Sequence, residues 1–128
     1  MILRVARHTD NLELVVKFYT EVIGLDIIGD FKNHEGYDGI FLGKENLDWH
    51  LEFTTSDEKA VHQPDADDLL VFYPKTSEEY DRLTERITVH NVPRAQAKNP
   101  YWNENGILIL DPDGFGIVIS DLRIKLQK

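Results

Sequence analysis

A histidine and a glutamate two positions apart, His50 and Glu52, form the strongest polar pair in the chain. On a strand, residues i and i+2 point to the same face and lie about 7 Å apart. Such a pair can ligate a metal ion, exchange protons with a substrate, or form a plain ion pair on a solvated sheet. Spacing alone favours the ion pair. With His8 added, the set has two histidines and one carboxylate, a composition that binds divalent iron, zinc or manganese.

Arginines near the N-terminus are the next candidates. Arg4 and His8 share one face of a predicted first strand, whereas Arg7 lies on the other. Which face points inward stays open, because Arg7 is not a typical core residue. Either arginine would recognise a carboxylate if it lay in a cleft.

Two neighbouring aromatic residues, Tyr101 and Trp102, lie in a predicted loop. They can stack on a planar or cationic ligand, fill a gap in the core, or contact a second subunit. The sequence leaves these alternatives open. It contains no nucleophile elbow and no glycine-rich phosphate loop.

The composition excludes several kinds of chemistry. Among 128 residues there are 14 Lys and Arg, 23 Asp and Glu, and no Cys, which gives a net charge of −9. Without Cys there is no disulfide framework, no thiolate catalysis and no Cys-ligated metal. The acidic balance argues against nucleic acid as a partner and suits either solubility or a cationic ligand. All apolar runs are strand-sized, so we expect no membrane partner and a cytoplasmic protein.

Hydrophobic periodicity predicts the elements that position these residues. One helix should begin at Asp10, with Glu13 completing a capping box, and end at Gly24. A second should begin at Thr76, with Glu79 in the corresponding position. Alternating patterns predict strands at 2–9, 26–32, 37–43, 49–55, 68–74, 92–97, 106–111 and 115–121, the last two joined by a turn at Asp111-Pro112-Asp113-Gly114.

The predicted elements repeat. Strand, helix and three strands occupy residues 1–61, a polar linker follows at 62–67, and the same order returns in 68–128. We therefore predict one α+β domain spanning residues 1–128. Its two βαβββ modules would form a curved mixed sheet around a concave cleft, with the helices outside.

Three segments resemble the vicinal oxygen chelate superfamily. This superfamily includes glyoxalase I, the bleomycin and fosfomycin resistance proteins and the extradiol dioxygenases. Asn11-Leu12-Glu13 through Gly24-Leu25 is similar to its "DLE…FY…VLGL" opening. His50 to Thr54 resembles its fourth strand, and Asp111 to Gly114 its closing "DPDG" hairpin. The resemblance covers essentially the whole chain and implies the fold predicted above.

Metal-dependent members of the superfamily place one ligand on each of four strands. The resemblance maps these ligands to Arg4, to Glu52, to Asp68 or Leu70, and to Val118. Arginine, leucine and valine do not ligate metals, so it implies that the usual metal site is lost.

Bleomycin-resistance proteins lack the metal and bind a cationic drug in acidic, aromatic-lined grooves. The resemblance thus implies a small-molecule-binding homodimer without a cofactor, whose ligand in the cleft is cationic or amphoteric. The alternatives are a structural or regulatory module, or a metal-dependent lyase, isomerase, dioxygenase or thiol transferase with a rearranged site of His8, His50 and Glu52. The predicted ligand contacts are Arg4, Arg7, His8, His50, Glu52, Asp68, Tyr101 and Trp102.

Overall fold

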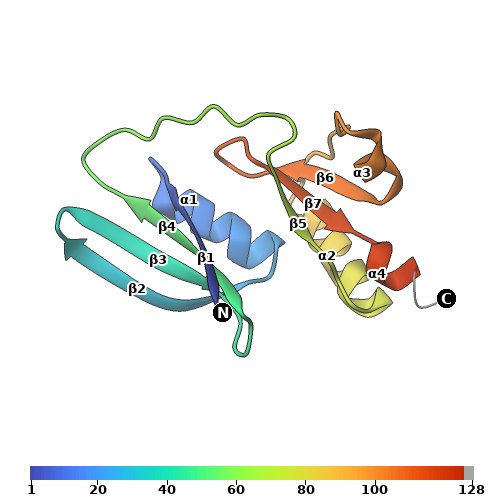
Figure 1. Ribbon diagram of the computed structural model, residues 1–128, viewed down its shortest axis with the longest axis horizontal. Coiled ribbons are helices and arrows are strands. Elements are labelled where there is room, and N and C mark those ends of the chain that lie inside the picture. Colours follow the sequence, from blue (N-terminus) through green and yellow to red (C-terminus); the bar gives the residue numbers. More distant parts are fainter. Residues whose placement is uncertain (126–128) are drawn as a thin grey trace. The chain divides into compact units, whose positions relative to one another are not determined.

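A computed structural model describes residues 1–125, in which two compact units are visible (Figure 1). Residues 1–62 form the N-terminal unit, and the chain from residue 63 onward forms the C-terminal unit. Each unit has its own sheet with both parallel and antiparallel strand pairs, which confirms the predicted α+β class. Within the described residues, no helix has the length and apolar character needed to cross a membrane. The single-domain organisation stays a prediction.

The N-terminal unit has the predicted βαβββ order. Its sheet has the strand order β1-β4-β3-β2, with β1 and β4 parallel and the other pairs antiparallel. The elements are β1 (Leu3–His8), α1 (Leu12–Lys17), the π-helical turn η1 (Phe18–Val22), β2 (Asp26–His34), β3 (Tyr37–Gly43) and β4 (Trp49–Thr55).

Helix α1 begins one residue later than the sequence pattern predicts. Asn11 is its N-cap, because the Asn11 side chain accepts a hydrogen bond from the Leu14 amide at 3.0 Å. The carboxylate of Asp10 instead accepts from the Ala60 amide at 2.7 Å, so the predicted capping box is wrong. Gly24 follows the helical segment with φ of +90°, as expected for a residue that ends it.

The core of this unit lies between α1–η1 and one face of the sheet. Val15 and Tyr19 are buried on the helical side, and Leu51 and Phe53 of β4 are buried on the sheet side. The rings of Tyr19 and Phe53 lie 4.9 Å apart. Because side chains alternate along a strand, the other face of β4 carries His50, Glu52 and Thr54.

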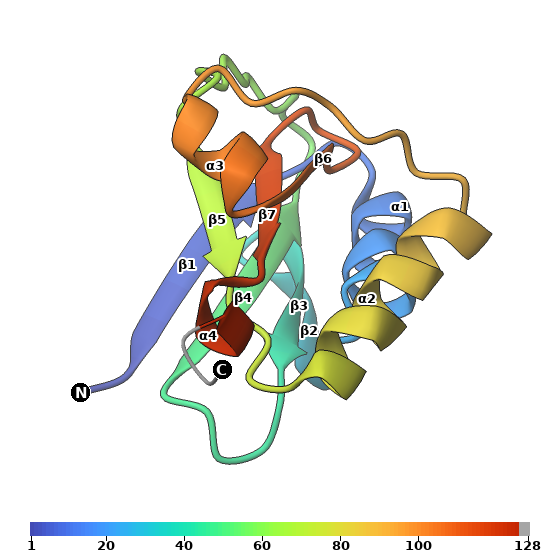
Figure 2. The ribbon, with the colours of Figure 1, turned by 90° about the vertical axis from the view of Figure 1, so that its right-hand side faces the viewer.

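The sheet of the C-terminal unit has the same strand arrangement as β1, β4 and β3 of the N-terminal sheet. Its order is β5-β7-β6, with β5 and β7 parallel, which corresponds to β1-β4-β3. Helices α2 and α3 lie on opposite sides of this sheet (Figure 2). The elements are β5 (Leu69–Phe72), α2 (Ser77–Val89), α3 (Pro100–Glu104), β6 (Gly106–Leu110), β7 (Gly116–Ser120) and α4 (Leu122–Lys125).

Two predicted features of this unit are confirmed in detail. Thr76 caps α2 by accepting from the Glu79 amide at 3.1 Å. In the turn before β7, the Gly114 amide donates to the Asp111 carbonyl at 2.9 Å, and Gly114 has φ of +89°. The buried Asp111 carboxylate accepts two further amide hydrogen bonds inside the turn.

The predicted strand at 92–97 is wrong. Only Ala95 pairs with the sheet, through an isolated bridge in which its amide donates to the Leu108 carbonyl at 2.8 Å. Pro93 has no amide hydrogen, so it cannot donate to a ladder at this position. The predicted loop that follows contains the short helix α3 instead.

Candidate functional site

The strand register settles which residues share a face in the N-terminal unit. Arg4 pairs with His50, and Ala6 pairs with Glu52, on the face turned away from α1. Arg7 pairs with the buried Phe53, so Arg7 lies on the helix side. Of the two candidate arginines, only Arg4 therefore shares a face with His50 and Glu52.

Arg4, His50, Glu52 and Phe41 form a connected group, here named the Arg4 cluster. Arg4 Nε donates to His50 Nε2 at 2.9 Å, and Arg4 Nη1 lies 3.6 Å from Glu52 Oε2. The guanidinium carbon lies 4.7 Å from the centroid of the Phe41 ring, a cation–π distance. An arginine Nε can only donate, so His50 Nε2 must be the accepting nitrogen, and the ring proton is on Nδ1.

Burial differs between the two charged members of the cluster. The Glu52 side chain is 14% exposed and the Arg4 side chain is 50% exposed. Arg4 therefore balances the charge of the more buried carboxylate while half of its own surface stays accessible. The Arg4–Glu52 contact is longer than a hydrogen bond, so both groups keep hydrogen-bonding capacity.

Aromatic rings line the rest of this face. The Phe31 ring lies 5.8 Å from Phe41, and it covers Gly39 so closely that a Cβ there would clash with it. The ring of Phe41 covers Gly29 in the same way, with a looser fit. Neither phenylalanine was predicted as a site residue from the sequence. The signal was present, because each lies across from a glycine on the neighbouring strand.

His8 shares this face but has other partners. Its Nε2 lies 3.0 Å from Ser56 Oγ, and its ring meets Tyr37 edge-on at 6.2 Å. Across residues 1–125, no group of three or more His, Asp or Glu side chains is arranged to hold a metal ion.

The Arg4 cluster does not fit the superfamily's metal ion. A permanently positive guanidinium already bonds His50 Nε2 and faces Glu52, so a second cation there would be repelled.

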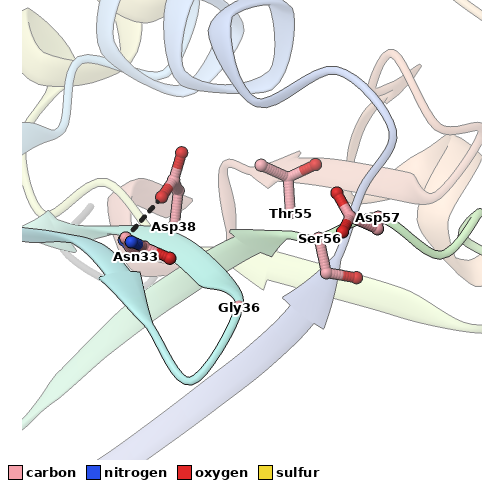
Figure 3. A pocket seen from close by; sticks show the side chains of 6 residues that line it. All are labelled: Asn33, Gly36, Asp38, Thr55, Ser56 and Asp57. Carbon is pink, nitrogen blue, oxygen red and sulfur yellow. Dashed lines mark hydrogen bonds between the residues drawn. The ribbon is translucent and has the colours of Figure 1, made fainter.

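A separate polar cavity of about 400 Å³ lies at the far end of the same unit (Figure 3). The Asn33 amide donates to Asp38 at 2.8 Å within the β2–β3 hairpin. Asp38 pairs with Thr55, on strand positions that alternate with those of the Arg4 cluster. None of the predicted ligand contacts lines this cavity. Its lining consists of Asn33, Gly36, Asp38, Thr55, Ser56 and Asp57.

In the C-terminal unit, the corresponding sheet face is apolar and covered. Val118 is 0% exposed and forms a core cluster with Ala97 and Leu108. Trp102 of α3 packs against this cluster. Of the three roles that the sequence left open for it, this contact supports filling a gap in the core. Tyr101 is 49% exposed and meets Trp102 edge-on, with the ring centroids 4.9 Å apart.

Asp68 lies in a turn just before β5. Its carboxylate accepts from the Asp65 amide at 3.1 Å, and its own amide donates to the Asp65 carbonyl at 3.0 Å. This side chain is exposed and stabilises the turn. Contact of Asp68, Tyr101 or Trp102 with a ligand held by the Arg4 cluster stays a prediction.

Comparisons with known proteins agree with this architecture. Residues 3–54 match the family model of the YycE-like N-terminal domain, and residues 67–121 match that of the YycE-like C-terminal domain. The uncharacterized protein YycE of Bacillus subtilis (strain 168) is 38% identical over 120 residues, which cover 93% of this chain and 86% of that protein.

Two solved structures carry the comparison further. A YycE protein of unknown function from Bacillus subtilis superposes with a TM-score of 0.84 at 37% identity, covering 94% of this chain and 88% of the other. Glyoxalase I of Leishmania major superposes with a TM-score of 0.74 at 20% identity, covering 99% and 90%. The chain therefore belongs to the YycE-like family, and its fold is that of the vicinal oxygen chelate superfamily.

Proposed function

We propose that this protein binds a small amphoteric molecule at the Arg4 cluster without using a metal ion. The observation that carries the proposal is the hydrogen bond from Arg4 Nε to His50 Nε2, beside the Glu52 carboxylate. This arrangement places a positive and a negative group side by side on one sheet face.

The chemistry of the face favours an amphoteric ligand over a purely cationic one. A cationic group would be attracted by Glu52 but repelled by Arg4, which is the more exposed of the two. A ligand with both charges can satisfy both side chains. The rings of Phe41 and Phe31 add an apolar surface for the rest of the molecule.

The remaining predicted contacts belong to the proposal as secondary contributors. His8 would bond the ligand from four positions further along β1. Asp68 and Tyr101 are the further predicted contacts. Trp102, whose ring meets that of Tyr101 edge-on, is also a predicted contact. A homodimer is also part of the proposal, and sedimentation equilibrium at two protein concentrations tests it.

The rival function is a metalloenzyme that uses His8, His50 and Glu52. The geometry disfavours it, because His50 Nε2 is engaged by Arg4 and His8 Nε2 lies beside Ser56 Oγ. The rival requires stoichiometric divalent metal in protein purified without a His-tag. Elemental analysis before and after reconstitution distinguishes the two functions.

The direct test is titration calorimetry on protein treated with a chelator. The panel should pair amphoteric drugs that carry a carboxylate and an amine with cationic drugs, including bleomycin. We expect binding of at least one amphoteric compound, weakened about tenfold or more in Glu52→Gln, because a charge-assisted contact contributes about 1.5–3 kcal/mol. Glu85→Gln, an exposed change on α2, is the matched control. No binding across the panel, or binding only after metal is added, would contradict the proposal.

A further inference from the structure

We infer that the Arg4 guanidinium takes the place of a metal ion in this site and binds an oxyanion of the ligand, either a carboxylate or a phosphonate or phosphate group. The inference rests on the proposed function and specifies the ligand's negatively charged part. It follows from the disagreement between the superfamily's metal site and the residues that this chain has in its place.

First, the surroundings of Arg4 resemble those of a bound cation. Two groups with lone pairs, His50 Nε2 at 2.9 Å and Glu52 Oε2 at 3.6 Å, face the guanidinium. An imidazole nitrogen and a carboxylate oxygen are also the donors that bind divalent cations. Arg4 is therefore held as a resident cation, by donors of the kind that a metal would use.

The second step is which hydrogens remain available. The Nε hydrogen is used by His50, and Nη1 is near Glu52 but beyond hydrogen-bond distance. Nη2 makes no hydrogen bond with any group in residues 1–125. The outer edge of the guanidinium thus keeps donors from both terminal nitrogens, and half of the side chain is exposed.

The third step is orientation. The hydrogen bond to His50 and the Phe41 ring 4.7 Å away restrict the guanidinium plane. A fork of donors fixed in this way matches the two oxygens of a carboxylate or phosphonate and loses little entropy on binding. Lysine offers a point charge without an Nε, so it could not make both the His50 contact and the fork.

The first test uses benzoate, phenylphosphonate and inorganic phosphate as probes. In the wild type their binding is followed through the Arg4 Nε–H signal in NMR spectra. In every protein, variants included, it is followed through the backbone amide signals of β1 and β4, and both readouts detect millimolar affinities. We expect the Arg4 signal to shift, with the dissociation constant raised about tenfold or more in both Arg4→Gln and Arg4→Lys. Arg82→Gln, an exposed change on α2, should bind like the wild type. The ranking of the three probes separates a carboxylate preference from a phosphonate or phosphate preference.

Two outcomes would overturn the inference. One is an unchanged dissociation constant in Arg4→Gln, and the other is the absence of any shift with all three probes. Binding of an amphoteric drug that is insensitive to Arg4→Gln would refute the inference and leave the proposed function standing. Failure of the whole drug panel would refute the proposed function itself.

The second test restores a metal ligand. Arg4→His would place a second imidazole directly beside His50, with Glu52 two positions further along the same face. We expect this variant to bind one zinc ion in calorimetry and the wild type to bind none at this site. Equal zinc binding by the two proteins, or none by the variant although its thermal melt shows it folded, would refute the replacement of metal by Arg4.

Discussion

The two sheets of this protein share a strand order but differ in the use of one face. In the N-terminal unit, the row Ala6–Glu52–Phe41 crosses β1, β4 and β3. In the C-terminal unit, the corresponding row Val71–Val118–Leu108 crosses β5, β7 and β6. The first row borders Arg4 and His50 and keeps charged groups, whereas the second is apolar and packs against Ala97 and Trp102.

The difference shows that the same strand arrangement can either expose charged groups on a sheet face or cover that face with apolar side chains. A carboxylate at Glu52 is stable because Arg4 balances its charge and half of Arg4 remains hydrated. A carboxylate at Val118 would have neither partner nor water, because α3 lies over it. Packing of Trp102 against the cluster therefore keeps the Val118 position apolar.

Exchanging the residue types between Glu52 and Val118 should cause the largest change in the free energy of unfolding. Val118→Glu buries an unpaired carboxylate, and we expect it to lower the free energy of unfolding by at least about 4 kcal/mol. Glu52→Val should change stability by less than about 1 kcal/mol, because Arg4 can remain hydrated. Urea unfolding followed by circular dichroism measures both. Equal effects at the two positions would mean that the C-terminal face is not closed.

Removal of the Trp102 side chain, which covers the cluster around Val118, should cause an intermediate loss of stability. Trp102→Ala exposes part of the cluster around Val118, and we expect a loss of about 2–3 kcal/mol, below the range for a fully buried tryptophan. Tyr101→Ala is the matched control and should cost less than about 1 kcal/mol, because Tyr101 is half exposed. Hydrogen exchange should then rise at the β6 and β7 amides. A larger loss from Tyr101→Ala would reverse the assignment of the two aromatic residues.

The titration of Tyr80 in the C-terminal unit should cause the smallest change in stability. Burial raises the pKa of Tyr80 above its usual 10.0, with Asp121 and Asp81 adding to the shift and Arg94 opposing it. The folded state therefore holds this proton more tightly than the unfolded state does. The resulting stability is complete below about pH 10 and is lost as pH rises through the folded-state pKa. Absorbance at 295 nm should show a late-titrating tyrosine that disappears in Tyr80→Phe. Its persistence in that variant would refute the assignment.

Much of the fold could be predicted from local patterns. Thr76 and Asp111 were predictable because each has a side-chain oxygen that satisfies nearby amides. The cap at Asn11 was misassigned to Asp10 because both side chains can cap a helix. Only the distant Ala60 amide, which bonds Asp10, decides between them. The failed strand around Pro93 shows the same limit, because alternation does not reveal whether a neighbour is available to pair.

The candidate site was predictable in part for the same reason. Strand alternation predicted that His50 and Glu52 share a face, but the choice between Arg4 and Arg7 depended on the β1–β4 register. Phe41 was missed because a phenylalanine on a strand is typical of a core. Its contact with the Arg4 guanidinium and its pairing with Gly29 both depend on which strands are neighbours, and that becomes visible only with the strand register.

The proposed site requires that His50 Nε2 binds the Arg4 guanidinium and not a metal ion. Long-range ¹H–¹⁵N NMR spectra of the histidine rings test it most directly, recorded near neutral pH before and after addition of zinc. We predict that Nε2 of His50 accepts the Arg4 hydrogen bond, with a ring proton on Nδ1, and that zinc leaves the His50 signals unchanged. A proton on Nε2, or a shift of His50 Nε2 when zinc is added, would contradict the account.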